Sequence, residues 1–245
     1  MSTNQPRKPP GTPAGGQWAP AQHAEADIEL GPAGPTMTQL PDGTREWRQD
    51  GKLHRTDGPA IERPDGFRAW CRHGRFHRTD GPAIEYPNGT TEWRRDGELH
   101  RIDGPAIERP DGFSAWYQGG KCHRADGPAV EYLDGAREWR QDGERHRTDG
   151  PAIERADGTH EWYLRGKLHR TGGPAVERAD GAREWYQHGK FHRIDGPAVE
   201  LPNGSRFWYY HGKLHRNDGP AVEYPNGTCR WYQHGELLRS DPPRA

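Results

Sequence analysis

A histidine recurs every 23 residues along most of this chain, with no insertion or deletion between copies. Each copy opens the motif His-Arg-x-Asp-Gly-Pro-Ala, except that Gly172 replaces the Asp once. Perfect spacing over so many copies requires each unit to make the same contacts with its neighbours. The sequence therefore predicts a linear array of stacked units. The repeated histidines are His54, His77, His100, His123, His146, His169, His192 and His215.

Tryptophan keeps the same step, and two glycine-containing turns flank each copy. An Asp-Gly or Asn-Gly pair such as 42–43 precedes the Trp, and a second X-Gly pair such as 50–51 follows it. Such pairs favour type I′ hairpin turns, and the intervening residues have strand character. We therefore predict an all-β fold: one elongated antiparallel sheet of nine stacked hairpin units, the last one truncated. The repeated tryptophans are Trp47, Trp70, Trp93, Trp116, Trp139, Trp162, Trp185, Trp208 and Trp231.

The return limb of each unit, residues 52–64 in the first, is too long for a plain partner strand. We expect residues 55–59 to form a kink before the chain resumes pairing, with Gly58 at positive φ. Two strands per unit is the preferred interpretation. A third strand at 52–55 is the alternative.

Side chains alternate between the two faces of a strand. From this we expect Trp47 and Ile61 to share a packed face together with Leu53. Glu46 and the residue after each Trp should then lie on a wet, charged face. The same assignment applies to the equivalent residues of every unit.

Three segments are expected along the chain. Residues 1–37 are rich in Pro and Gly and predict a flexible, disordered head; residues 38–241 are the array; residues 242–245 are a tail. No stretch has the length and hydrophobicity of a membrane span or a signal peptide, so we expect a cytoplasmic protein with no transmembrane segment. The cysteines Cys71, Cys122 and Cys229 fall at unrelated repeat positions and predict no disulfide pattern.

The repeat resembles the MORN repeat, in particular its bacterial variant group, some members of which are labelled antitoxins. The resemblance is carried by the 23-residue hairpin unit, the Glu-Trp-x-x-x-Gly-x-x-His pattern and the later Asp-Gly turn. One difference is that Arg55 and its equivalents follow the His, where the usual repeat has Gly. The resemblance implies an elongated sheet used as a scaffold or interaction surface, with lipid binding attributed to eukaryotic relatives.

The histidine column does not predict a metal site. Equivalent atoms in successive units would lie about 9.6 Å apart, whereas two ligands of one zinc ion lie within about 4 Å. We expect each His to be structural, packing on Trp or donating to Asp or a carbonyl. We also expect each motif Arg to be neutralised by the Asp two residues later. Nothing resembles a nucleophile with its base, so we predict no enzyme, no metal and no cofactor.

The favoured function is therefore a non-enzymatic scaffold or protein-binding module. The alternatives are an antitoxin, immunity or anti-defence protein that masks a toxin or effector, and a polymer or membrane-surface binder acting by avidity. A formal net charge of −1 argues against non-specific nucleic-acid binding. Self-association is left open. The candidate partner-binding residues are Tyr186, Tyr209, Tyr210, Tyr232, Arg193 and Arg216.

Overall fold

The computed structural model describes residues 34–243, which consist of strands, turns and loops with no helix among them. The predicted all-β repeat array is confirmed. The first strand begins at Thr36, within the segment expected to be a head, and residues 1–33 of that segment lie outside the described residues.

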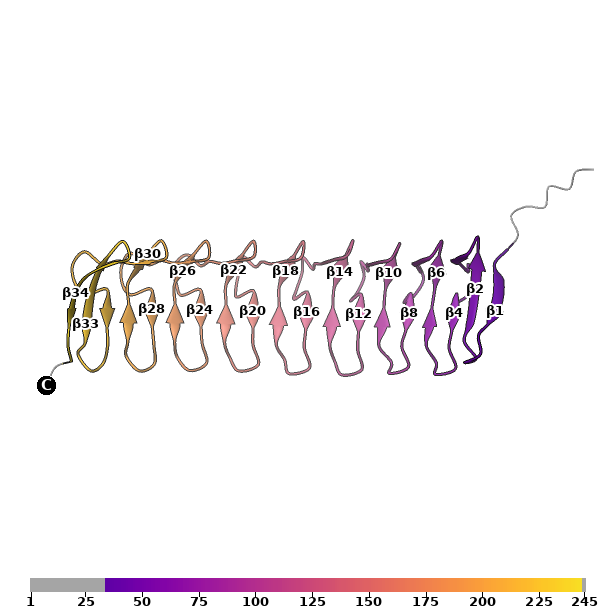
Figure 1. Cartoon of the computed structure of the whole chain (residues 1–245), viewed down its shortest axis with the longest axis horizontal. Helices are drawn as coiled ribbons and strands as arrows, with labels where there is room; N and C mark the ends of the chain where they lie inside the picture. Colours follow the sequence, from indigo (N-terminus) through magenta and orange to yellow (C-terminus); the bar gives the residue numbers. More distant parts are fainter. Residues whose placement is uncertain (1–33, 244–245) are drawn as a thin grey trace, which may run out of the picture. The chain divides into compact units, whose positions relative to one another are not determined.

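One antiparallel sheet of 20 strands runs through all the repeats. Neighbouring strands follow one another in sequence, so no connection crosses the sheet (Figure 1). After the first unit, each unit adds two short strands. The strands are β1 (Thr36–Gln39), β2 (Arg45–Gln49), β3 (Lys52–Leu53), β4 (Ile61–Glu62), β5 (Arg68–Ala69), β8 (Ile84–Glu85), β9 (Thr91–Glu92), β12 (Ile107–Glu108), β13 (Ser114–Ala115), β16 (Val130–Glu131), β17 (Arg137–Glu138), β20 (Ile153–Glu154), β21 (His160–Glu161), β24 (Val176–Glu177), β25 (Arg183–Glu184), β28 (Val199–Glu200), β29 (Arg206–Phe207), β32 (Val222–Glu223), β33 (Cys229–Gln233) and β34 (Glu236–Asp241).

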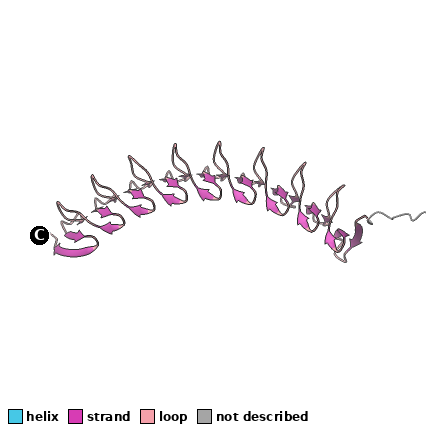
Figure 2. Cartoon of the chain, turned by 90° about the horizontal axis from the view of Figure 1, so that it is seen from above, coloured by secondary structure: helices cyan, strands magenta, loops and turns pink. Residues whose placement is uncertain are grey.

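A small second hairpin, here called the side hairpin, leaves the sheet after each Trp and stands along one edge of the array (Figures 1 and 2). The main sheet thus gains two strands per unit, as preferred. The segment equivalent to 52–55 also pairs, but only with the strand just before it. The side hairpins pair β6 (Cys71–Arg72) with β7 (Arg75–Phe76), β10 (Arg94–Arg95) with β11 (Glu98–Leu99), β14 (Tyr117–Gln118) with β15 (Lys121–Cys122), β18 (Arg140–Gln141) with β19 (Glu144–Arg145), β22 (Tyr163–Leu164) with β23 (Lys167–Leu168), β26 (Tyr186–Gln187) with β27 (Lys190–Phe191), and β30 (Tyr209–Tyr210) with β31 (Lys213–Leu214).

The two turns of a unit are of different types. Asp50 and Gly51, at the tip of a side hairpin, have φ of 51° and 73°, as a type I′ turn requires. At the opposite turn only Gly66 has positive φ, and its N–H donates to the carbonyl of Arg63 over 3.1 Å. The type I′ prediction is wrong there. Pro64 fixes a negative φ at the first central position, and Leu133 and Ala156, which replace the Pro in other units, do not have positive φ either.

The expected face assignment is also wrong. Ile61 pairs directly with Glu46, and directly paired residues share a face, so the Ile/Val column lies on the face opposite Trp47. We call the Ile/Val side the packed face. A representative cluster on it joins Val130 with Ala115 and Cys122, and Ile107, Phe113 and Tyr117 pack against them. The Trp rings are half-buried on the other side, here called the ladder face.

The most deeply buried column is alanine. The Ala of each His-Arg-x-Asp-Gly-Pro-Ala motif is fully buried where the chain re-enters the sheet. Its backbone exchanges hydrogen bonds with the neighbouring strand, as Ala60 does by donating to the carbonyl of Ala69 over 2.8 Å. A larger side chain has no room at this step of the repeat. The column is Ala60, Ala83, Ala106, Ala129, Ala152, Ala175, Ala198 and Ala221.

Candidate binding surface

Each motif Arg on the ladder face is held from several sides. The guanidinium carbon of Arg55 lies 4.0 Å from the ring centre of Trp47. Its Nε donates to Asp57 over 2.9 Å and its Nη1 donates to the carbonyl of Pro59 over 3.2 Å. These contacts lower the pKa of Asp57, because the hydrogen bond from Arg55 favours the carboxylate. The expected neutralisation of the arginine column is present in this geometry.

Gly58 fits against that arginine and does not serve as a left-handed hinge. Its φ lies outside the positive range, so the predicted positive φ is wrong. A Cβ at this position would stand 2.9 Å from Cζ of Arg55. The glycine of the motif is therefore required by the close approach of the guanidinium.

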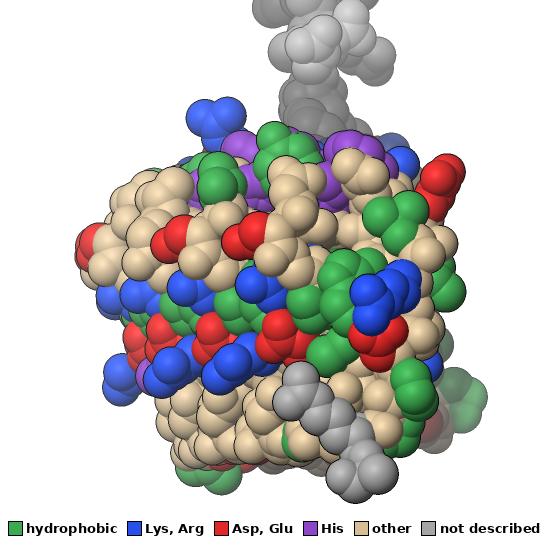
Figure 3. Space-filling model, turned by 90° about the vertical axis from the view of Figure 1, so that its left-hand side faces the viewer, with side chains coloured by type: hydrophobic (Ala, Val, Ile, Leu, Met, Phe, Trp, Pro, Cys, Tyr) green, Lys and Arg blue, Asp and Glu red, His purple; other side chains and the backbone are tan. Residues whose placement is uncertain are grey.

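Glutamates and further arginines continue the row of charges across the ladder face. Glu62 lies 3.6 Å from Nη1 of Arg55 on one side and 3.7 Å from Nη1 of Arg45 on the other. Parallel rows of acidic and basic side chains, with hydrophobic side chains between them, are visible at the carboxyl-terminal end of the array (Figure 3). The face is polar, but its charges are largely paired within the chain.

Arg193 and Arg216, two of the predicted partner-binding residues, belong to these paired rows. Arg193 donates to Asp195 over 3.0 Å and to Glu200 over 3.1 Å. Arg216 makes the equivalent bonds to Asp218 and Glu223. A partner carboxylate would therefore have to compete with two carboxylates of this chain at each arginine.

The four predicted tyrosines occupy three different settings. Tyr186 and Tyr209 stack on either side of Phe191, with ring centres 4.2 and 5.0 Å away. The hydroxyl of Tyr186 donates to Glu184 over 2.9 Å, and burial raises the pKa of Tyr186. Tyr232 is half-buried in β33. Tyr186 and Tyr209 thus fill the packed face.

Tyr210 points the other way and is 41 % exposed. Its ring centre lies 4.3 Å from that of His211 and 5.0 Å from that of His192. It borders a groove of about 900 Å³ between two successive motif loops, which we call the carboxyl-terminal groove. Among the lining residues are Ile194, Pro197, Trp208, Tyr210, His215 and His234.

Ile194 was not predicted as a site residue, although it is 83 % exposed at the rim of this groove. It occupies the variable position of the motif, where Thr148 and Thr171 stand in earlier units. A groove of about 570 Å³ two units earlier has Leu164 in place of Tyr210. A large apolar residue at this position was the available signal in the sequence, although Ile102 shares it.

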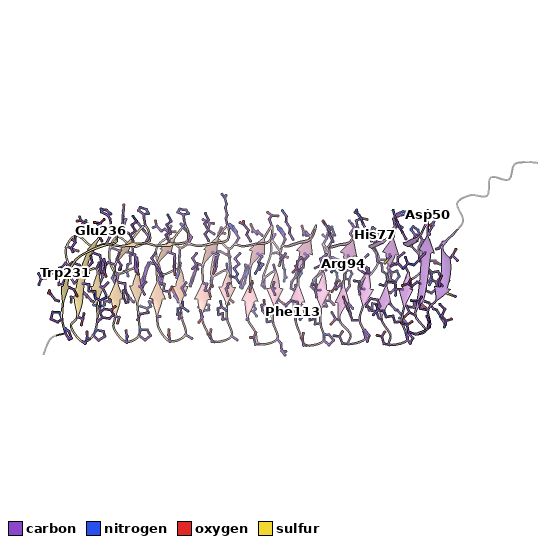
Figure 4. All side chains as sticks on the ribbon, in the orientation of Figure 1. Asp50, His77, Arg94, Phe113, Trp231 and Glu236 are labelled. Atoms are coloured by element: carbon purple, nitrogen blue, oxygen red, sulfur yellow. The ribbon has the colours of Figure 1, made fainter. Side chains whose placement is uncertain are left out.

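The repeated histidines join one unit to the next. Nδ1 of His77 accepts a hydrogen bond from the backbone N–H of Asp96, at the tip of the following side hairpin, over 3.2 Å. This is a structural role. The backbone contact was not among those expected, but Nδ1 of His77 also lies 2.9 Å from Oδ1 of Asp96, which fits the expected donation to Asp. His77 and Asp50 lie along the edge formed by the side hairpins, away from Phe113 (Figure 4). The equivalent pairs are His54 with His73, His100 with Gly119, His123 with Asp142, His146 with Arg165, His169 with His188, His192 with His211 and His215 with His234.

Two further groups of side chains could bind a metal ion or react covalently: the potential metal ligands and the cysteine thiols. Within residues 34–243 no cluster of three or more His, Cys, Asp or Glu side chains is arranged to hold a metal ion. Burial raises the pKa of both Cys71 and Cys122 to about 11, so both are protonated thiols at neutral pH.

Comparison with models of protein families gives no match for this chain. Comparison with curated proteins gives no match either. In the part of the chain that the structure describes, no helix has the length and apolar character needed to cross a membrane. The geometry of the residues is therefore the basis for assigning a role.

Proposed function

We propose that this chain is a non-catalytic repeat scaffold that binds a protein partner through the carboxyl-terminal groove. The observation that carries the proposal is the exposure of Ile194 and Tyr210 beside a groove that also contains Trp208. Tyrosine and tryptophan are favoured in the central contacts of protein interfaces. Exposed apolar side chains grouped at a groove are typical of interaction sites.

The pairing of charges on the ladder face supports the same location. Arginines such as Arg193 already have two carboxylate partners, so binding there would first cost those contacts. Arg193 and Arg216 also line the groove, but its exposed Ile194 and Tyr210 offer apolar and aromatic contacts that leave those ion pairs intact. A scaffold role also agrees with what the resemblance to the MORN repeat implies.

The test is a pull-down from a lysate of the source organism with the full chain and with the double variant Tyr210→Gln/Ile194→Thr. Gln187 and Thr171 occupy these repeat positions in the preceding units, so the variant should keep the fold. A protein retained at high salt by the wild type and lost by the variant is the expected result. A stoichiometric one-to-one complex would favour the antitoxin form of this function.

Ile102→Thr is the matched control. Ile102 stands at the same repeat position as Ile194 and is 75 % exposed, but it does not line the carboxyl-terminal groove. It should leave recovery of the partner unchanged. Equal recovery of the same proteins by wild type and double variant would contradict the proposed groove.

A second candidate, avidity binding of a linear polyanion, is favoured by the tips of three successive side hairpins. Lys167, Lys190 and Lys213 form no ion pair with any carboxylate within residues 34–243, unlike the motif arginines. Their spacing of about 9.6 Å would present one cation per unit. Retention on heparin that is lost at moderate salt, and lost in the triple Lys→Gln variant, would support this candidate over the groove.

A further inference from the structure

The hydrogen bonds between successive units dictate the protonation state of the repeated histidines. In each pair described above, the N–H of a tip residue is directed at Nδ1 over 3.1 to 3.2 Å, and Nδ1 accepts it when unprotonated. Nδ1 of His77 is also within 2.9 Å of Oδ1 of Asp96, a contact that a hydrogen on Nδ1 would satisfy instead. An imidazolium carries a hydrogen on both ring nitrogens and cannot accept at either. Protonation of a repeated His therefore removes the bond that joins its unit to the next.

The tip residue decides what happens after that bond is lost. Asp96 lies 2.9 Å from Nδ1 of His77, and Asp142 lies 3.5 Å from Nδ1 of His123. At these two contacts a protonated histidine gains an ion pair in exchange for the backbone hydrogen bond. Acid should therefore change the contact without separating the units.

The carboxyl-terminal contacts have no such exchange. The rings of His169, His192 and His215 lie against those of His188, His211 and His234, with ring centres 4.6, 4.5 and 4.4 Å apart. Protonation of both members places two like charges at that separation. The preceding contact, between His146 and Arg165, already has a cation at its tip. Four successive contacts thus lack an acidic tip residue.

Other charged and titratable groups around these pairs do not remove the effect. Tyr210 contacts three of the histidines and brings no carboxylate to them. The groove near His215 also contains Asp195 and Asp218, but each accepts a hydrogen bond from its own motif arginine. Asp149 has the same relation to Arg147 near His169. Lys167, Lys190 and Lys213, which follow the tips of these side hairpins, add further positive charge.

We propose that the carboxyl-terminal end of the array, residues 162–241, is an acid-sensitive segment whose units separate as its histidines become protonated, while contacts with an acidic tip residue hold. Neighbouring units stabilise one another in a repeat array, so an end with several weakened contacts in succession opens before the middle. At the amino-terminal end, the contact between His54 and His73 also lacks an acidic tip residue, but it is a single contact and not one of several in succession.

The pKa of the histidines in the folded state sets the direction of the pH effect. Burial, together with the neighbouring His188 and His211, lowers the pKa of His169 and His192. The stability contributed by such a group is fully present above the unfolded pKa of about 6.5 and is lost as the pH falls through the lower folded value. Hydrogen bonds from the motif arginines lower the pKa of Asp149, Asp195 and Asp218, so these carboxylates stay ionised below this window.

Amide hydrogen exchange of the full chain at pH 7.5 and pH 5.5, expressed as protection factors, tests the proposal. We expect protection in residues 162–241 to fall about tenfold or more at the lower pH, because several neighbouring contacts weaken together. Residues 91–141 should change much less, because only the contact of His100 with Gly119 lacks an acidic tip residue there and the contacts on both sides of it have one. Uniform loss, or earlier loss in residues 91–141, would overturn the proposal.

Two variants separate the tip residues from any general effect of acid. The first is the triple variant His188→Asp/His211→Asp/His234→Asp, which places an aspartate at the tip of each carboxyl-terminal contact, as Asp96 is at its own. It should remove most of the pH-dependent loss of protection there. Asp96→His/Asp142→His should create acid sensitivity in the amino-terminal half. Unchanged pH profiles in both variants would show that the histidine pairs are not responsible.

Discussion

Arg147 lies against Trp139, with its guanidinium carbon 3.9 Å from the ring centre of the indole. The same side chain donates to Asp149 over 3.0 Å and to the carbonyl of Pro151 over 3.1 Å. It also bonds Glu154 on the returning strand over 3.1 Å. One residue therefore connects the Trp column, the motif loop and the main sheet, and the Trp ring is the surface that holds it in place.

Trp139→Ala should lower the free energy of unfolding by about 3 kcal/mol, the low end for a buried Trp because this ring is only half-buried. Trp139→Phe keeps an aromatic surface under Arg147 and should cost clearly less. Urea denaturation at pH 7.5 measures both. A loss below about 1 kcal/mol for the Ala variant would show that the indole does not support the arginine.

Gly150→Ala should destabilise the array by displacing Arg147. The new Cβ would stand 2.8 Å from Cζ of the arginine, so we expect a cost of about 1 to 3 kcal/mol. The cost should nearly vanish in an Arg147→Ala background, because the obstructed group is then absent. Chemical denaturation of the two single variants and the double variant gives the coupling.

Gly143→Ala is the control for that cycle. Gly143 has φ of 87° with no atom within 4 Å of an added Cβ, so its substitution is strained by backbone conformation alone. Its cost, about 1 kcal/mol, should be the same with and without Arg147. If the costs of Gly150→Ala and Arg147→Ala also proved additive in the double variant, the steric explanation would be wrong.

Much of the fold could be predicted from the 23-residue period. Constant spacing requires identical contacts between units, and the glycine pairs fix where the hairpins turn. The register between strands could not be predicted in this way. Trp47 and Ile61 were assigned to one face, but a shift of one residue in pairing moves every side chain to the other face. The observed partner of Ile61 is Glu46.

The binding surface was predictable in part. Tyr209 and Tyr210 are adjacent, so strand alternation alone places them on opposite faces, and only Tyr210 is substantially exposed. The role of Gly58 depends on a side chain folding back onto the backbone, which spacing does not reveal. Pro64, by contrast, was a visible sign that the turn beside it is not type I′.

Arg165→Asn should stabilise the array. Arg165 has φ of 49° at the tip of a side hairpin, a conformation that Asn, Asp and Gly adopt more readily than Arg. Asp142 and Gly119 occupy the same position in other units. We expect a gain of about 0.5 to 1 kcal/mol, seen as a higher thermal midpoint at pH 7.5. A lower midpoint would mean that the Arg side chain makes a stabilising contact.

Alkylation of the folded protein at pH 8 should distinguish the three cysteines. Burial raises the pKa of Cys71 and Cys122 to about 11, so their thiolate fraction is small, while Cys229 is only half-buried. We expect iodoacetamide to modify Cys229 more than about ten times faster than the other two, as followed by peptide mass spectrometry. In denaturant the three rates should converge. Equal rates in the native state would contradict the burial of the packed face.

Substitutions at Tyr186 and Tyr210 should separate packing from recognition. Tyr186→Ser removes a ring stacked on Phe191 and leaves Glu184, which is 8 % exposed, without that hydroxyl donor. It should cost about 3 kcal/mol, and Tyr186→Phe about 1 kcal/mol, because the latter loses the hydrogen bond alone. Tyr210→Ser should change stability by no more than about 0.5 kcal/mol, since exposed positions tolerate substitution. Thermal and urea unfolding measure the stability of the three variants. If Tyr210→Ser proved the most destabilising, the assignment of Tyr186 to packing and Tyr210 to recognition would be wrong.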